Sequence, residues 1–168
     1  MTVEKDLILN KNQIFQKIKR IAFEILENNF NEKELVIAGI AEGGYKLAGF
    51  LMDELTKESE FKLRLVKISL DKKAPFKSKI EVDCDIKTLK DKPIIIVDDV
   101  LHTGRTFVQS MKPFLDVDVK KIETVVLVNR CQTHFPVTAN YTGYELSTTL
   151  TDHVLVDLSS HDFGVYLY

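Results

Sequence analysis

The sequence predicts a single α/β domain over residues 1–168, with a twisted, mainly parallel sheet, helices on both faces and a flexible hairpin loop. Three observations support this. Several short segments are apolar throughout, as strands covered on both faces are. Segments with helical spacing of apolar residues alternate with them along the chain. A chain of 168 residues, 45% of them hydrophobic, is also long enough to bury one sizeable core.

The first half of the chain has the pattern helix, strand, helix, strand. Residues 14–26 show helical spacing, and Asn10 or Asn12 is placed to cap the start of that helix. Residues 35–40 form a continuous apolar run that predicts a buried strand, which Gly43 and Gly44 end. A helix to Leu55 is expected next, and then a strand at 62–68 with one solvated face.

Residues 69–92 differ from the rest because lysine and aspartate dominate and only 80–82 look extended. A polar insertion of this length in a compact domain is usually a functional or mobile loop, so we expect a flexible hairpin here. Beyond it, the sequence predicts a strand at 93–99 and a helix from Thr106 to about Phe114. Further strands are expected at 122–128, 154–158 and 164–168.

Composition narrows the class of protein. The chain has 23 Lys and Arg against 25 Asp and Glu, a formal net charge of -2, which gives no support to nucleic-acid binding. Cys84 and Cys131 lie far apart and predict neither a disulfide framework nor a zinc site. The N-terminus has no apolar signal core and no run reaches transmembrane length, so we expect a cytoplasmic protein without a membrane partner.

Two adjacent carboxylates, Asp98 and Asp99, follow the apolar strand predicted at 93–99. In open α/β sheets ligands bind beyond the carboxyl ends of the strands, and acidic groups there are costly unless something occupies them. Ionised carboxylates are pure acceptors, which suits a vicinal diol such as the 2- and 3-hydroxyls of a ribose. The pair therefore predicts a sugar-binding site.

A phosphate cradle is predicted directly after this pair, where Thr103-Gly104-Arg105-Thr106 turns into a helix. Free backbone N–H groups at a helix start bind anions, the glycine permits close approach, and Arg105 adds charge. A diol site followed by a phosphate cradle suits ribose 5-phosphate. The alternative is an aspartate-rich turn before a capped helix with no ligand. The two commonest other phosphate motifs, G-x-x-x-x-G-K-[ST] and G-x-G-x-x-G, are absent from the sequence.

The run Ile95-Ile96-Val97-Asp98-Asp99-Val100-Leu101-His102-Thr103-Gly104-Arg105-Thr106 resembles the phosphoribosyl diphosphate (PRPP) signature of type I phosphoribosyltransferases. Within that superfamily the chain is most similar to the bifunctional pyrimidine-operon attenuator and uracil phosphoribosyltransferase family. That likeness also rests on residues 18–25, 126–130 and 135–143. It implies transfer of 5-phosphoribose from PRPP to a nucleobase, a pyrimidine such as uracil, with release of pyrophosphate.

The resemblance also implies roles for individual residues. Asp98 and Asp99 are the catalytic pair on the ribose hydroxyls, and the 5-phosphate is bound by His102, Thr103, Gly104, Arg105 and Thr106. Ala41, Glu42, Gly43 and Gly44 occupy the pyrophosphate-loop position. Residues 129–168 form a base-side hood, with Asn129, Arg130, Tyr141 and Gly143 on the base side. Mg²⁺ arrives with PRPP, with Asp98, Asp99 and Asp157 as candidate ligands. A homodimer or higher homo-oligomer is expected.

Two departures keep other functions open. Attenuator-type members usually place an arginine in the pyrophosphate loop and purine-type members a lysine, whereas this chain has Glu42 and no basic residue at 41–44. A non-catalytic regulator that senses nucleotides or PRPP and binds RNA is therefore one alternative, although the charge balance does not favour RNA. Gly43-Gly44-Tyr45-Lys46 resembles purine salvage enzymes of the hypoxanthine-guanine type, but those have an aspartate where this chain has His102.

Overall fold

The computed structural model describes residues 5–74, 76–159 and 161–168 and contains two sheets. A six-stranded sheet has the order β4-β3-β2-β5-β6-β7, and a three-stranded sheet has the order β1-β9-β8. The elements are β1 (Asp6–Asn10), α1 (Lys11–Asn28), β2 (Glu34–Ile40), α2 (Ala41–Glu58), β3 (Lys62–Ser69), β4 (Glu81–Val82), the 3₁₀ helix η1 (Ile86–Leu89), β5 (Pro93–Leu101), α3 (Arg105–Leu115), β6 (Lys121–Asn129), β7 (Tyr141–Glu145), β8 (Val154–Asp157) and β9 (Gly164–Leu167).

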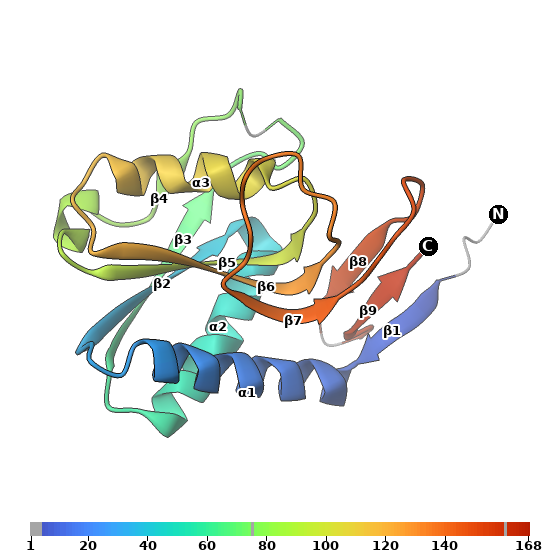
Figure 1. Cartoon of the computed structure of the whole chain (residues 1–168), viewed down its shortest axis with the longest axis horizontal. Helices are drawn as coiled ribbons and strands as arrows, with labels where there is room; N and C mark the ends of the chain where they lie inside the picture. Colours follow the sequence, from blue (N-terminus) through green and yellow to red (C-terminus); the bar gives the residue numbers. More distant parts are fainter. Residues whose placement is uncertain (1–4, 75, 160) are drawn as a thin grey trace.

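The larger sheet confirms the predicted architecture. Strands β3, β2, β5, β6 and β7 are parallel, and only the short β4 runs antiparallel to its neighbour β3. Helices α1 and α2 cover one face of this sheet and α3 covers the other (Figure 1). Successive residues of β5 alternate between the two layers: Ile95 packs with α1 and α2, and Ile94 and Ile96 pack with α3. Burial on both faces explains why these strands are apolar throughout.

Helix α1 starts where the sequence indicates. Asn10 is the N-cap, and its side chain accepts from the backbone N–H of Gln13 while the Gln13 side chain accepts from Asn10 N–H. This reciprocal arrangement is a capping box, which satisfies two backbone donors at the helix start. The apolar stripe buries Ile14, Ile18 and Ile25 against the sheet.

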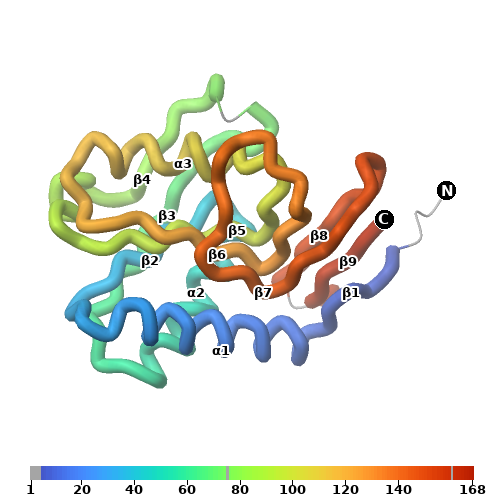
Figure 2. Tube along the Cα trace, viewed as in Figure 1, coloured from blue at the N-terminus to red at the C-terminus, as the bar shows by residue number. Residues whose placement is uncertain are grey.

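The two strands predicted at the C-terminal end are present, but they do not join the parallel sheet. Strands β8 and β9 pair antiparallel with each other, and β9 pairs antiparallel with β1. Figure 2 shows the first strand and the last two side by side at one end of the molecule. Strands β1 and β7 were not predicted: β1 has only three apolar residues between Asp6 and Asn10, and β7 contains Gly143.

The polar segment 69–92 contains little regular structure. Strand β4 forms an antiparallel hairpin with β3, close to the extended stretch predicted at 80–82. Asp83 fixes this hairpin because its backbone N–H donates to Lys67 O and its carboxylate accepts from Lys67 N–H. Helix η1, capped by the Asp85 side chain, was not predicted. In the part of the chain that the structure describes, no helix combines the length and apolarity that crossing a bilayer requires.

Candidate active site at the carboxyl edge of the parallel sheet

The aspartate pair lies near the end of β5, at the edge where the parallel strands end. Asp98 is 2% exposed, and its Oδ1 accepts from the backbone N–H of Asp99 at 3.0 Å. Asp99 is half-buried, and its Oδ1 accepts from the N–H of Val100 at 2.9 Å. Both carboxylates are thus oriented by the backbone that follows them, so that two acceptor groups sit together at the predicted place.

A lysine that sequence reasoning did not select contacts both carboxylates. Lys72 Nζ lies 2.6 Å from Asp98 Oδ1 and 3.1 Å from Asp99 Oδ1. Burial, reinforced by the neighbouring Asp99, raises the pKa of Asp98 to about 8, while Lys72 acts in the opposite direction. Desolvation lowers the pKa of Lys72, but the two carboxylates outweigh it and the net shift is upward. Lys72 is therefore the cation that allows two adjacent acids to be buried here.

The residues predicted as a pyrophosphate loop form the first turn of α2 instead. Ala41 begins the helix at φ 47°, and the helix start lies directly against β5. A Cβ on Gly43 would lie 2.7 Å from Asp99 Cγ, and one on Gly44 would lie 3.0 Å from Asp98 Cα. The two glycines are therefore needed for close approach to the aspartate pair. The strand ends at Ile40 as expected, but a helix and not a loop follows it, and pyrophosphate binding by 41–44 stays a prediction.

Glu42 has a lysine partner on the neighbouring strand. Its Oε1 lies 2.6 Å from Nζ of Lys67, which is near the end of β3, and this hydrogen bond lowers the pKa of Glu42 and raises that of Lys67. Lys67 also lies over the ring of Tyr45, 5.5 Å from its centroid. The negative charge of Glu42 is thus compensated locally.

The start of α3 forms a cavity of about 180 Å³ next to the aspartate pair. Gly104 is the N-cap with φ 84°, a left-handed conformation that favours glycine. The cavity is lined by Lys72, Val100, Leu101, His102, Thr103, Gly104, Thr106 and Phe107. Four of the five residues predicted to bind phosphate therefore line one cavity at a helix N-terminus, where backbone N–H groups and the helix dipole favour an anion.

Arg105, the fifth, does not line that cavity. Its guanidinium lies between two aromatic rings, 5.3 Å from the centroid of Phe76 and 5.4 Å from that of Phe135. These three residues and Gln109 line a neighbouring hollow of about 360 Å³. Arg105 thus links Phe76 to Phe135 through a cation–π contact with each ring.

The segment 130–140 contacts the backbone of the cavity through Thr103. Thr103 O accepts from the backbone N–H groups of His134 at 2.9 Å and Phe135 at 3.1 Å. His102 is exposed, and partial desolvation, followed by the positive charge of Arg130, lowers its pKa. The neutral imidazole is therefore the main form near neutral pH.

The predicted base-side residues separate into two groups. Arg130 is buried and donates to Thr148 Oγ1 at 3.1 Å, Thr149 O at 3.4 Å and Asp152 O at 2.8 Å, which fixes the segment that follows β7. Asn129 Oδ1 accepts from the N–H of Cys131. Both residues therefore order the backbone near the carboxyl edge.

The other two base-side residues lie in the core. Tyr141 is 2% exposed in the cluster that contains α1 and α2, and burial raises its pKa to about 12. Gly143 packs against β6, where a Cβ would lie 2.6 Å from Leu127 O, and its carbonyl accepts from Arg20. The structure brings neither residue into the cavity at the start of α3.

Asp157 is separate from the aspartate pair. Its Oδ1 accepts from Ser159 N–H at 2.7 Å, which lowers its pKa, and it lines another hollow of about 210 Å³ with Lys5, Leu155, Asp162 and Tyr166. Within the described ranges, no three His, Cys, Asp or Glu side chains are grouped as a metal site. The structure thus does not assemble Asp98, Asp99 and Asp157 into one metal centre.

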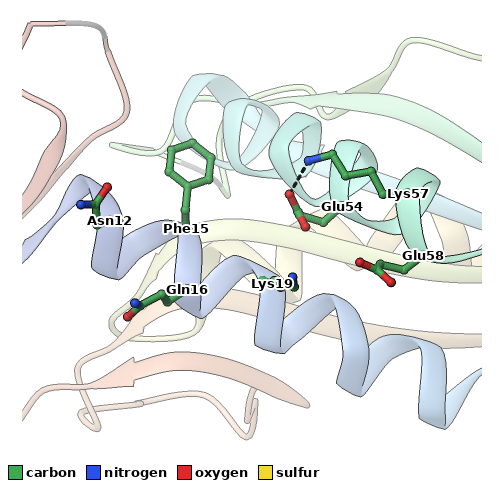
Figure 3. A pocket seen from close by; sticks show the side chains of 7 residues that line it. All are labelled: Asn12, Phe15, Gln16, Lys19, Glu54, Lys57 and Glu58. Carbon is green, nitrogen blue, oxygen red and sulfur yellow. Dashed lines mark hydrogen bonds and ion pairs between the residues drawn. The ribbon is translucent and has the colours of Figure 1, made fainter.

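A shallow hollow of about 510 Å³ between α1 and α2 shares no residue with this site. Figure 3 shows its lining side chains, among them Lys57, which is bonded to Glu54 at 2.7 Å across one helical turn. None of its residues was predicted to bind a ligand.

The fold is that of the type I phosphoribosyltransferases. It resembles the crystal structure of a hypoxanthine-guanine phosphoribosyltransferase from Bacillus anthracis, with a TM-score of 0.79, 19% identity and coverage of 98% of both chains. It also resembles the hypoxanthine phosphoribosyltransferase of Trypanosoma cruzi, with a TM-score of 0.79, 15% identity and coverage of 96% and 95%.

The chain belongs to the phosphoribosyltransferase family, because the family described as "Phosphoribosyl transferase domain" matches residues 5–161. Similar relatives include the bifunctional protein PyrR of Bacillus pumilus, 32% identical over 95% of this chain and 93% of the relative. The PyrR of Clostridium kluyveri is 30% identical over 94% and 93%.

Proposed function

We propose that this protein transfers 5-phosphoribose from PRPP to a nucleobase and releases pyrophosphate. The single observation that supports this most is the continuity of the site. The carboxylates of Asp98 and Asp99 are followed within a few residues by the cavity at the start of α3, so one segment offers a diol acceptor and then an anion site. Ribose 5-phosphate has the matching groups in the same order.

The chain would act mainly by positioning and electrostatics. Asp98 and Asp99 accept hydrogen bonds from the ribose hydroxyls, and the backbone at 103–106 binds the 5-phosphate. A ring nitrogen of the base then forms a bond to C1 of the ribose while the C1–O bond to diphosphate breaks. The electron pair of that bond leaves with pyrophosphate, and the base loses its N–H proton to water.

Mg²⁺ enters this proposal with the substrate. The donor set at the site is two carboxylates already paired with Lys72, which is too few for a cage made of protein ligands alone. Diphosphate and water oxygens would supply most of its coordination, and the bound ion would neutralise charge on the leaving group.

We propose a pyrimidine such as uracil as the acceptor base. The 30–32% identity to PyrR proteins over almost the whole chain supports this, whereas the likeness to hypoxanthine-using enzymes lies in the fold. The purine alternative predicts turnover with hypoxanthine or guanine. Offering uracil, hypoxanthine and guanine together with PRPP and analysing the nucleotides formed distinguishes the two.

The central test is calorimetric titration of magnesium-PRPP into the wild-type protein and into the double variant Asp98→Asn/Asp99→Asn. We expect binding by the wild type, at least a tenfold weaker binding by the double variant (about 1.4 kcal/mol or more), and pyrophosphate release when uracil is added. Absence of PRPP binding to the wild-type protein would refute the proposal.

A non-catalytic regulator that binds nucleotides and RNA is the second candidate, favoured by the name of the PyrR relatives, "bifunctional", and by the lack of a basic residue at 41–44. On α1, however, Arg20 donates to Thr142 O and Gly143 O and Lys17 lies over the ring of Tyr144. Arg20 and Lys17 therefore already have partners within the protein and are less available to bind RNA phosphates. PRPP binding without turnover on any base, together with a salt-sensitive gel shift in the presence of uridine nucleotide, would favour the regulator.

A further inference from the structure

Lys72 contacts both aspartates of the site, although nothing in the sequence around it indicates such a contact. It comes from the polar segment 69–80, yet its ammonium group bridges the two carboxylates of β5 and lines the cavity at the start of α3. Among the described residues that line this cavity, Lys72 alone has a permanent positive charge. It is therefore next to the predicted ribose site and next to the predicted phosphate site at the same time.

The bridge and a bound ribose need the same oxygen atoms. Asp98 Oδ1 accepts from Lys72 and from Asp99 N–H, and Asp99 Oδ1 accepts from Lys72 and from Val100 N–H. The other oxygen of Asp99 faces Gly43 at close range. Ribose hydroxyls can gain full access to the pair only when Lys72 gives up its bonds. A displaced ammonium group, whose side chain is 36% exposed, then gains from an anion placed beside it, because charge-assisted hydrogen bonds are the strong ones.

The diphosphate of PRPP is such an anion, and the other described residues that line this cavity include no lysine or arginine. Residues 41–44 contain no lysine or arginine, and the nearby Lys67 is bonded to Glu42. The guanidinium of Arg105 is held between two aromatic rings outside the cavity. Resting on the function proposed above, we propose that Lys72 is the diphosphate-binding cation of this protein, which exchanges Asp98 and Asp99 for phosphate oxygens when the ribose hydroxyls bind the aspartates.

The segment that carries Lys72 is held beside the phosphate cavity by its own turns and by a contact with α3. Turn hydrogen bonds join Ala74 N–H to Asp71 O at 3.1 Å and Lys77 N–H to Ala74 O at 3.0 Å. The ring of Phe76 packs on Arg105, which is the first residue of α3. The segment is thus attached beside the phosphate cavity, and the flexible lysine side chain can change partners while the backbone stays in place.

The test compares two ligands that differ by the diphosphate. Affinities of ribose 5-phosphate and magnesium-PRPP are measured by calorimetry for wild type, Lys72→Gln, Lys72→Arg and Lys73→Gln. Lys73 is the matched control, an exposed lysine one residue along the same segment. We expect Lys72→Gln to weaken PRPP at least about tenfold, as for loss of a charge-assisted hydrogen bond, and ribose 5-phosphate less than about threefold. Lys72→Arg should recover most of the PRPP affinity and Lys73→Gln should match wild type.

Three results would overturn the proposed role of Lys72, and a fourth would overturn the proposed function. Tighter binding of both ligands by Lys72→Gln would mean that the lysine only blocks the diol site. Equal weakening of both ligands would mean that it only maintains the aspartate pair. A wild-type protein that binds ribose 5-phosphate and PRPP equally well would also contradict the role of Lys72 but leave the diol and phosphate sites intact. A wild-type protein that binds neither ligand would contradict the proposed function itself.

Discussion

Gly43 in the first turn of α2 and Asp99 on β5 lie in direct contact, so close that a Cβ on Gly43 would come within 2.7 Å of Asp99 Cγ. Real Cβ atoms do not approach other atoms so closely, so any side chain at position 43 must displace the carboxylate or the helix start. The geometry of the aspartate pair therefore depends on a glycine more than fifty positions earlier in the sequence.

Gly43→Ala is expected to weaken magnesium-PRPP binding at least about tenfold, because the Asp99 carboxylate must move from its position on the ribose site. Gly49→Ala is the matched control in the same helix, since a Cβ there meets nothing within 4 Å. Alanine at position 49 should leave binding unchanged and stabilise the protein by about 0.5–1 kcal/mol. Calorimetry and urea unfolding on both variants check this, and wild-type affinity in Gly43→Ala would contradict it.

The buried carboxyl of Asp98 makes stability depend on pH. Its folded-state pKa is raised from 3.8 to about 8, so between these values the folded protein retains a proton that the unfolded chain has released. Stability therefore falls as pH rises through this window. Lys72 stays protonated throughout it, because its pKa is raised from 10.5.

Asp98→Asn removes this dependence. Relative to wild type, its free energy of unfolding should increase by more than about 1 kcal/mol between about pH 5 and about pH 8. Urea unfolding at the two pH values measures the change, with the exposed Asp116→Asn as control. A difference between Asp98→Asn and wild type that stays constant with pH would show that Asp98 ionises normally.

Phe76 is expected to support ligand binding without touching the ligand. Its ring packs on the Arg105 guanidinium, and an exposed contact of this kind contributes about 0.5–1 kcal/mol. Phe76→Ala should therefore weaken PRPP binding by about two- to fivefold and make the segment 69–80 more sensitive to proteolysis. Phe30→Ala, which removes another exposed phenylalanine, is the control. Equal proteolysis of the two variants would show that the stack does not order the segment.

Substitutions of Gly104 measure the backbone strain at the start of α3, where the cavity lies. Its φ of 84° is unfavourable for residues with a Cβ, although a Cβ there would meet Phe135 and Val137 only at ordinary contact distance, 3.5 Å. Gly104→Ala should therefore cost about 1–2 kcal/mol of stability through strain alone. Gly104→Asn should cost less, because asparagine tolerates this conformation better. Thermal unfolding ranks the two, and equal losses would point to crowding instead.

The sequence allowed the local parts of the site to be predicted and not the parts that depend on tertiary contact. Asp98, Asp99 and the residues at 102–106 are continuous, so their strand–turn–helix pattern could be read directly. Lys72 lies 26 residues before Asp98 in a segment without periodicity, and no local pattern indicates that it bridges the aspartates. Gly43 and Gly44 were expected to end the strand and to form a loop. The strand does end at Ile40, but the glycines lie in a helix, and their lack of a side chain allows contact with β5.

In the fold, too, the elements with a local sequence pattern were predicted and those that depend on long-range pairing were not. Strands that are buried on both faces were predicted correctly, because burial makes them apolar throughout. Strand β7 was missed because it alternates and contains Gly143, which is small where it packs on Leu127. The pairing of β8 and β9 with β1 joins the two ends of the chain, and no local sequence signal specifies such a long-range pairing.

Arg130 has a consequence for how this region can diverge. Two of the three hydrogen bonds donated by its side chain go to main-chain carbonyls, those of Thr149 and Asp152, and every residue type has a carbonyl. Those two bonds therefore do not depend on the side chain at position 149, whereas the Asp152 carboxylate accepts from Thr149 N–H at 2.7 Å and helps to hold the same turn. Substitutions at position 149 can therefore be accommodated while the path of the backbone persists. A phosphoribosyltransferase built in this way can exchange side chains along this segment without first losing the shape of its backbone.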